Sequence, residues 1–132
     1  MFVDTSVVVA LLAGEPEADG FAAKIAAATA PVTSGLVVLE AAMRLSSLLD
    51  LDPVYAEDRI HAVLEQAAIA IVPIDGVVAT AAVAAFAAYG KGRGHPAQLN
   101  LADCMSYACA RVHKLALLFK GDDFSKTDIA VA

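Results

Sequence analysis

The sequence predicts an α/β fold in which a small, mostly parallel sheet lies between layers of helices. Short apolar segments alternate with longer segments of helical periodicity along the whole chain, and the apolar segments show no regular alternation with polar residues. Such strands are typical of parallel sheets that helices cover on both faces. The 132 residues suit one domain over residues 1–132, because a chain of this size can bury one sizeable hydrophobic core.

The first half of the chain predicts strands and helices whose ends are marked by particular residues. Gly14 stops the first helix and Pro16 opens the second, since glycine suits the end of a helix and proline its first turn. Ser34 is placed to cap the third helix, and Pro53 begins the fourth. The predicted ranges are strands over 1–4 and 31–33 and helices over 5–13, 16–28, 35–48 and 53–68.

The second half continues the alternation. The β-branched apolar run 69–74 predicts a buried strand, and Asp75 is placed to cap an alanine-rich helix over 76–89. After a flexible, basic loop, Asn100 is placed to cap a helix that runs to about His113. The remaining predicted features are a strand over 115–119, a polar turn over 120–123 and an edge strand over 129–131.

Composition and charge exclude several classes of function. Asp and Glu number 15 against 9 Lys and Arg, so the formal net charge is -6 and a broad basic surface for nucleic acid is excluded. Cys104 and Cys109 point in different directions from one predicted helix and cannot pair, so a reducing cytoplasm is expected. No membrane association is expected. Asp4 stands where a signal peptide would carry a basic residue, and the uncharged stretch 76–90 is shorter than the roughly 20 residues of a bilayer span.

Acidic residues occur where a parallel sheet would gather them, because the carboxyl ends of its strands meet at one edge. Clustered carboxylates repel one another unless a cation screens them, and hard divalent ions such as Mg²⁺ or Mn²⁺ prefer oxygen ligands. Such an ion polarises a phosphoryl oxygen and activates water, so the pattern indicates metal-assisted hydrolysis of phosphodiesters. The acids are Asp4 at the end of the first strand, Glu40 inside an apolar helix, Asp103 in the first turn of a helix, and Asp122 and Asp123 after a later strand.

Each acid also has a purely structural interpretation. Asp4 and Asp103 suit helix starts, where they cap the helix or complement its dipole. Asp122 and Asp123 suit an ordinary turn. Glu40 is the hardest to explain in this way, because apolar residues flank it on both sides.

Four segments, taken in order, carry a family resemblance. They are Phe2-Val3-Asp4-Thr5-Ser6, Leu39-Glu40 within its apolar helix, Leu99-Asn100-Leu101-Ala102-Asp103-Cys104, and the run from Leu117 to Phe124 followed by Thr127-Asp128-Ile129. Each motif is weak alone. The set spans the whole chain and resembles the PIN domain, and it is most similar to the VapC toxins of bacterial toxin–antitoxin pairs.

This resemblance implies a PIN-like three-layer fold and a ribonuclease that depends on Mg²⁺ or Mn²⁺. It places family acids at Asp4, Glu40 and Asp103, and a fourth at Asp122 or Asp123, of which Asp123 is the more regular position. It also implies a small VapB-type antitoxin, whose tail blocks the acidic cleft, and a homodimer.

Roles for the acids follow from the resemblance and from metal chemistry. Asp4 and Asp103 are expected to bind the metal ion, and Glu40 to hold a water molecule and help it lose a proton. Asp122 and Asp123 are expected to complete the outer shell or to bind a second ion.

Five further residues are candidates for contacts with an RNA substrate, for which transfer and ribosomal RNA are the candidate classes. Thr5 and Ser6, at a helix start, either hold a phosphate or water or serve only as caps. Lys91, Arg93 and Lys120 supply cations that could contact phosphates. The alternative for Lys91 and Arg93 is a solvated surface loop with no such role.

Two other classes of function are weighed against the nuclease. A receiver-like signalling domain binds Mg²⁺ through adjacent acids after its first strand, whereas Asp4 stands alone there and Asp75 occupies a different kind of helix start. The other is a catalytically inert PIN-like binding module, against which the complete set of acids argues.

Overall fold

Four parallel strands form the sheet in the order β3-β2-β1-β4, in a computed structural model that describes residues 1–132. Strand β1 is central, since Phe2 pairs with Val32 on one side and with Leu117 on the other. Because all pairings are parallel, the carboxyl ends of the strands meet at one edge of the sheet. The strands are β1 (Phe2–Val3), β2 (Val32–Ser34), β3 (Ala70–Val72) and β4 (Leu117–Leu118).

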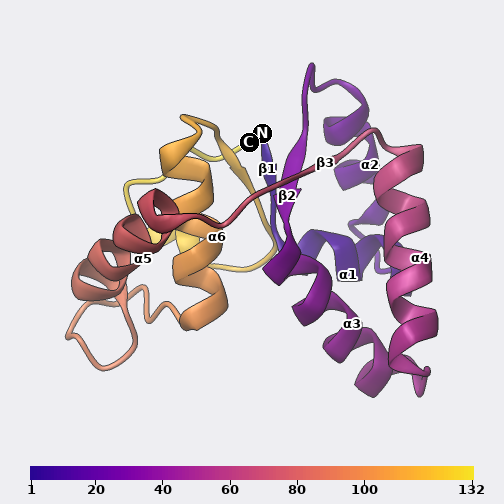
Figure 1. Cartoon of the computed structure of the whole chain (residues 1–132), viewed down its shortest axis with the longest axis horizontal. Coiled ribbons are helices and arrows are strands. Elements are labelled where there is room, and N and C mark those ends of the chain that lie inside the picture. The colour runs from indigo at the N-terminus through magenta and orange to yellow at the C-terminus, as the bar shows by residue number, and fades with distance from the viewer.

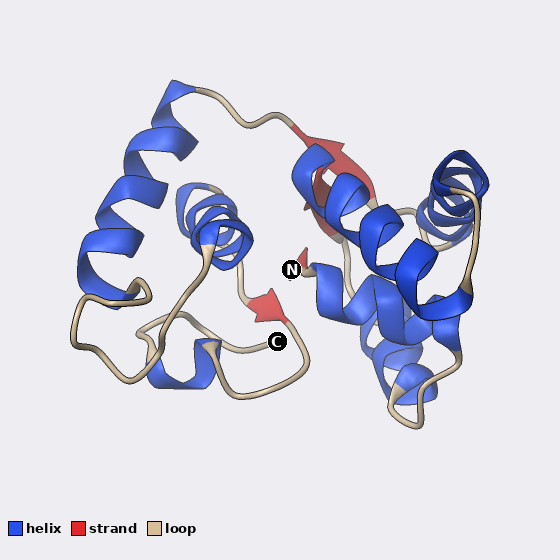
Figure 2. Cartoon of the chain, turned by 90° about the horizontal axis from the view of Figure 1, so that it is seen from below, coloured by secondary structure: helices blue, strands red, loops and turns tan.

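Helices cover both faces of this sheet. Helices α5 (Gly76–Tyr89) and α6 (Leu101–Val112) lie on one side, and α1 (Thr5–Ala13), α2 (Ala18–Ala26), α3 (Gly35–Leu49) and α4 (Pro53–Gln66) lie on the other (Figure 1). The view from below shows the same two groups of helices with the strands between them (Figure 2). A short 3₁₀ helix, η1 (Phe124–Lys126), follows β4. The predicted α/β arrangement, a small parallel sheet between helical layers, is confirmed.

One hydrophobic core joins the helices that carry the candidate acids. Val7 of α1, Leu45 of α3 and Ile60 of α4 are buried in the same cluster as Cys109 of α6. Cys104 and Cys109 are both free, as predicted, and both are buried. Because close packing of this kind leaves side chains little room to move, α1, α3 and α6 form rigid supports for residues at their ends.

Most helix ends agree with the predicted signals. Gly14 ends α1 in the left-handed conformation, with φ of 66°. Asp75 begins α5, where its Oδ1 accepts hydrogen bonds from the backbone N–H groups of Val77 and Val78 at 3.0 Å each. These ends were predictable because capping depends on residues close together in the sequence. No helix is long and apolar enough to cross a membrane.

The strand predicted over 69–74 is present as β3, but the prediction that it is buried is wrong. Strand β3 is shorter, lies at the edge of the sheet beside β2 alone, and exposes Ala70 and Ile71. Helix α5 follows β3 in the chain but packs against α6, which contacts β1 and β4. A β-branched apolar run predicts a strand from local preference, and it carries no information about which helix covers that strand.

Smaller differences occur at three other elements. Pro16 lies in the turn before α2, which begins at Ala18. Ser34 does stand at the start of α3, but its side chain makes no capping hydrogen bond. The tail predicted as an edge strand over 129–131 forms only an isolated bridge between Val131 and Leu117.

Candidate active site

Asp4 lies at the carboxyl end of β1, where it is buried and begins α1. Its backbone N–H donates a hydrogen bond of 3.0 Å to the carbonyl of Leu118, at the end of β4. This bond brings the end of β1 beside the start of the turn over 120–123. The predicted convergence of the two strand ends is therefore present.

Ser6 holds one oxygen of the Asp4 carboxylate. Asp4 Oδ2 accepts hydrogen bonds from the backbone N–H of Ser6 at 3.0 Å and from its hydroxyl at 2.7 Å. The Ser6 hydroxyl in turn accepts a hydrogen bond of 2.9 Å from the backbone N–H of Lys120. Asp4 is thus a helix cap, as the structural interpretation allowed. Its other oxygen, Oδ1, makes no hydrogen bond within the chain and is therefore free to bind a ligand.

Glu40 comes to the same region from α3, where it is half-buried. Packing of α1 against α3 sets it beside Thr5, whose hydroxyl donates a hydrogen bond of 2.6 Å to Glu40 Oε2. Thr5 itself is buried, so this donor has a fixed place. Thr5 and Ser6, predicted as contacts for phosphate or as caps, both bind candidate acids.

Asp103 is fixed by a capping box at the start of α6. Its Oδ2 accepts a hydrogen bond from the backbone N–H of Asn100, and Asn100 Oδ1 accepts one from the backbone N–H of Asp103, each at 2.9 Å. The pKa of Asp103 is raised from 3.8 to about 6, chiefly by burial and against the opposing effect of the Asn100 hydrogen bond. The negative charges of Asp4, Asp123 and Glu40 contribute smaller parts of this increase.

The electrostatics of Asp103 identify which acids gather. The charges of Asp4, Glu40 and Asp123 each help to raise the pKa of Asp103, whereas Asp122 is not among the charges that do so. Asp122 instead begins the turn into η1, where its backbone carbonyl accepts hydrogen bonds from the N–H and hydroxyl of Ser125 at 3.2 and 2.6 Å.

The donor set of this acidic cluster (Asp4, Glu40, Asp103 and Asp123) fits a hard divalent cation. No group of three or more Asp, Glu, His or Cys side chains in the chain is placed to hold a metal ion. Mg²⁺ commonly binds through only one or two carboxylates and keeps several waters, so a closed protein cage is not required. The raised pKa of Asp103 means that this carboxyl group ionises less readily beside the other acids. A bound cation would favour its ionised form.

Lys120, predicted to contact phosphate, instead pairs with two glutamates. Its Nζ lies 2.6 Å from Glu15 Oε2 and 3.1 Å from Glu17 Oε2. The hydrogen bonds to Glu15 and Glu17 both raise the pKa of Lys120, and the bond to Glu15 has the larger effect. The ammonium group is therefore already occupied by two carboxylates.

The other predicted basic contacts, Lys91 and Arg93, lie in the exposed loop after α5. The Arg93 guanidinium lies over the ring of Phe86 at 5.7 Å from its centroid. Neither residue forms an ion pair within the chain, so both keep their charge free for an external anion.

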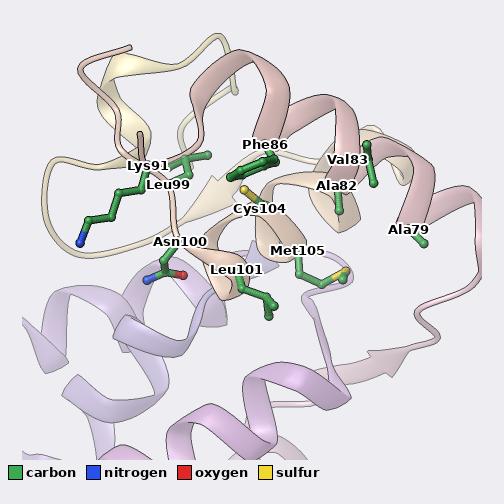
Figure 3. A pocket seen from close by; sticks show the side chains of 10 residues that line it. All are labelled: Ala79, Ala82, Val83, Phe86, Lys91, Leu99, Asn100, Leu101, Cys104 and Met105. Carbon is green, nitrogen blue, oxygen red and sulfur yellow. The ribbon is translucent and has the colours of Figure 1, made fainter. Parts of the chain in front are cut away.

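Sequence reasoning missed an apolar groove between α5 and α6. It has a volume of about 570 Å³, and Phe86 and Val83 line one wall while Leu101 and Met105 line the other (Figure 3). Asn100 also lines it, so the groove opens beside the capping box that holds Asp103. The available signal was helix 76–89 itself, which is apolar all round and cannot bury every side chain against one neighbour.

A second groove, of about 690 Å³, runs beside Glu40 between α1 and α3. Its lining mixes acidic Glu15 with Arg44 and with the exposed side chain of Met43. The acidic cluster is thus flanked by one apolar groove and one polar groove.

Comparisons with a family model and with curated proteins indicate the same family. The family model described as the PIN domain matches residues 1–130. Ribonuclease VapC30 of Mycobacterium tuberculosis (strain H37Rv) is 41% identical, over 98% of this chain and 96% of its own length. Ribonuclease VapC of Mycolicibacterium smegmatis is 40% identical, over 98% of each chain.

A solved structure has the same fold as this chain. A chain of a toxin-antitoxin complex from Klebsiella pneumoniae superposes with a TM-score of 0.72, covering 99% of this chain and 95% of that one at 23% identity. At that identity the likeness concerns the fold alone. The family model and the curated relatives go further: this chain belongs to the PIN-domain family and, within it, to the VapC ribonucleases.

Proposed function

We propose that this chain is the endoribonuclease toxin of a toxin–antitoxin pair and that it depends on Mg²⁺ or Mn²⁺. The observation that supports the proposal is electrostatic: Asp4 lies at the carboxyl edge of the sheet, and the charges of Asp4, Glu40 and Asp123 help to raise the pKa of Asp103. Ligand sites in open α/β sheets lie at this edge. The relatives named ribonucleases supply the reaction class.

Asp4 and Asp103 would hold the metal ion, with Asp123 as the fourth acid. Asp4 offers a free Oδ1 while Ser6 fixes its other oxygen. Asp123 is preferred over Asp122 because its charge acts on Asp103. When bound, the cation supplies positive charge beside the scissile phosphate and lowers the pKa of water.

Glu40 would act as the base. The hydrogen bond from Thr5 occupies Oε2 and leaves Oε1 to accept a proton from the attacking water. The water oxygen would then bond to phosphorus while the opposite P–O bond of the RNA backbone breaks, and the leaving oxygen would take a proton from solvent. A positioned base within hydrogen-bond reach of its proton is what this role demands.

The RNA would be held by few phosphate contacts. Lys91 and Arg93 are the free cations of the loop after α5, and Arg44 lines the groove beside Glu40. With a net charge of -6, the chain has little non-specific affinity for RNA, so recognition would depend on shape and single-stranded loops. Structured RNAs with such loops, transfer and ribosomal RNA, are the proposed substrate class.

An antitoxin and a second copy of the chain are the proposed protein partners, in the reducing cytoplasm. The solved complex with this fold contains a toxin and an antitoxin. The apolar groove between α5 and α6 offers a surface for such a partner beside the acids. Further exposed apolar side chains, at Leu39, Met43 and Leu48 of α3, give a second contact surface.

The test is cleavage of total cellular RNA by the purified chain, with Mg²⁺, with Mn²⁺ or with EDTA. Discrete fragments are expected only with a metal ion, and Asp103→Asn and Asp123→Asn should abolish them. Asp122→Asn, the matched control one residue away, should retain cleavage. Metal-independent cleavage, or equal loss in Asp122→Asn and Asp123→Asn, would refute these assignments.

A further inference from the structure

We propose that Lys120 is a positioning residue that clamps the turn bearing Asp123 to both ends of α1 and so sets where Asp123 stands relative to Asp4. This role replaces the predicted contact with phosphate. It rests on the proposed function only for the activity measurements in its test.

The first half of the clamp is made by the backbone. The N–H of Lys120 donates a hydrogen bond of 2.9 Å to the Ser6 hydroxyl, and that hydroxyl donates its proton to Asp4 Oδ2 at 2.7 Å. Because a hydroxyl has one proton and two lone pairs, Ser6 can serve both partners at once. The start of the turn is thus tied to the Asp4 carboxylate at the first turn of α1.

The second half is made by the side chain. Lys120 Nζ binds Glu15 at 2.6 Å and Glu17 at 3.1 Å, just beyond the end of α1. Glu15 is itself fixed to that helix, since its backbone N–H donates to the carbonyl of Ala10 at 3.0 Å. One residue therefore contacts α1 at its first turn and beyond its last.

The other end of the turn is held by packing. Phe124, next to Asp123, is buried, and its ring lies 5.0 Å from that of Phe119 between centroids. Asp122 and Asp123 thus stand between two anchors, Lys120 and Phe124. Loss of the Lys120 side chain leaves the start of the turn held by the backbone hydrogen bond to Ser6 alone.

A phosphate contact by Lys120 is disfavoured by charge. An RNA phosphate would have to displace Glu15 or Glu17 from the ammonium group. Two carboxylates and one ammonium also leave local negative charge, which repels phosphate.

The experiment compares Lys120→Met with the double variant Glu15→Gln/Glu17→Gln, and uses Lys114→Met, at the far end of α6, as the matched control. Mn²⁺ affinity is measured by titration calorimetry, and kcat and KM on RNA separately. Both clamp variants should weaken Mn²⁺ binding and lower kcat by a factor of roughly 1.5 to 5, the scale of exposed ion pairs. KM should change little in either clamp variant. A triple variant that joins Lys120→Met to Glu15→Gln/Glu17→Gln should lose no more Mn²⁺ affinity or kcat than Lys120→Met alone. Lys120→Arg should retain most of the parent chain's Mn²⁺ affinity and kcat.

A phosphate contact predicts the opposite pattern. Lys120→Met would then raise KM, most steeply at low salt, and Glu15→Gln/Glu17→Gln would lower KM by freeing the ammonium group for RNA. That pattern, or Mn²⁺ affinity and kcat unchanged in both clamp variants, would overturn the proposal.

Amide hydrogen exchange of residues 120–124 in EDTA separates the clamp from the proposed function. Both clamp variants should exchange faster there than the parent chain, and Lys114→Met should not. A parent chain without metal binding or cleavage would refute the nuclease proposal while the exchange data still decide the clamp. Unchanged exchange in Lys120→Met would refute the clamp whatever the activity.

Discussion

At the scale of single residues, the acidic cluster is organised by the hydroxyls of Thr5 and Ser6, which follow Asp4 directly in the chain. Ser6 orients Asp4 within one helical turn, while Thr5 reaches across to Glu40 on α3. The acids themselves could be predicted from residue type and from their places at strand ends and helix starts. Their hydrogen-bond partners could not, because the Thr5–Glu40 and Lys120–Glu15 pairs join residues far apart in the sequence.

Replacing Thr5 with Val should lower kcat by roughly tenfold or more, because Glu40 then loses the donor that orients it as a base. Thr5→Ser keeps the hydroxyl and should retain most of the activity. Steady-state kinetics on a single RNA substrate measures both variants. Equal losses in Thr5→Val and Thr5→Ser would show that packing at this buried position, and not the hydrogen bond, is what matters.

The raised pKa of Asp103 gives a pH dependence with a definite sign. Its folded-state value of about 6 lies above the ordinary 3.8, so the folded chain holds this proton more tightly than the unfolded chain. Without metal, the free energy of unfolding should therefore fall as pH rises through the window between these values and stay lower above it. Relative to the parent chain, Asp103→Asn should gain melting temperature in EDTA between pH 5 and 7.5. A constant difference between the two proteins would contradict the shift.

Mn²⁺ should reverse this dependence. Metal ligands must lose their protons, so stabilisation by Mn²⁺ should be larger at pH 7.5 than at pH 5. Thermal unfolding with and without Mn²⁺ measures it, and Asp103→Asn should show little stabilisation at either pH. If stabilisation by Mn²⁺ were the same at both pH values, Asp103 would not be a ligand of the metal ion.

At the scale of secondary-structure elements, the helices were predicted more accurately than the strands. Helix ends depend on local capping residues such as Asp75 and Asn100. Strand surroundings depend on distant chain segments, which is why the run at 69–74 was wrongly expected to be buried. The groove between α5 and α6 was missed for the same reason, since it arises only where two helices meet.

The capping box of α6 links helix stability to the site. Asn100→Ala removes the acceptor for the Asp103 backbone N–H and should lower the free energy of unfolding by roughly 0.5–2 kcal/mol. It should also weaken Mn²⁺ binding, because Asp103 then stands at a frayed helix start. Asp75→Ala, the same kind of loss at α5, should lower stability similarly without affecting Mn²⁺. Urea unfolding and calorimetry separate the two effects, and equal Mn²⁺ affinities would contradict the link.

At the scale of the whole molecule, an acidic chain must bind a polyanion through a few local cations. The core between α1, α3 and α6 fixes the acidic cluster, and the loop after α5 carries Lys91 and Arg93 beyond it. This division was partly visible in the sequence, since net charge and the basic loop can both be counted. The pairing of Lys120 with glutamates was not, and it leaves fewer cations for RNA than the sequence predicts.

Replacing both Lys91 and Arg93 with Gln should raise KM for every RNA tested and leave kcat nearly unchanged. The salt dependence of RNA binding should also become shallower, by up to about 1 in log–log slope for each phosphate that the loop no longer neutralises. Binding measured over a series of salt concentrations tests this. An unchanged slope would show that the loop only links α5 to α6.

The central claim is that the acids at the carboxyl edge of the sheet form one metal site, and Mn²⁺ titration calorimetry on the parent chain, Asp4→Asn and Asp103→Asn tests it most directly. The account predicts saturable binding to the parent chain and its loss in both variants, each of which stays folded. Mn²⁺ binding of undiminished affinity in Asp103→Asn would contradict it, because the ion would then be held elsewhere.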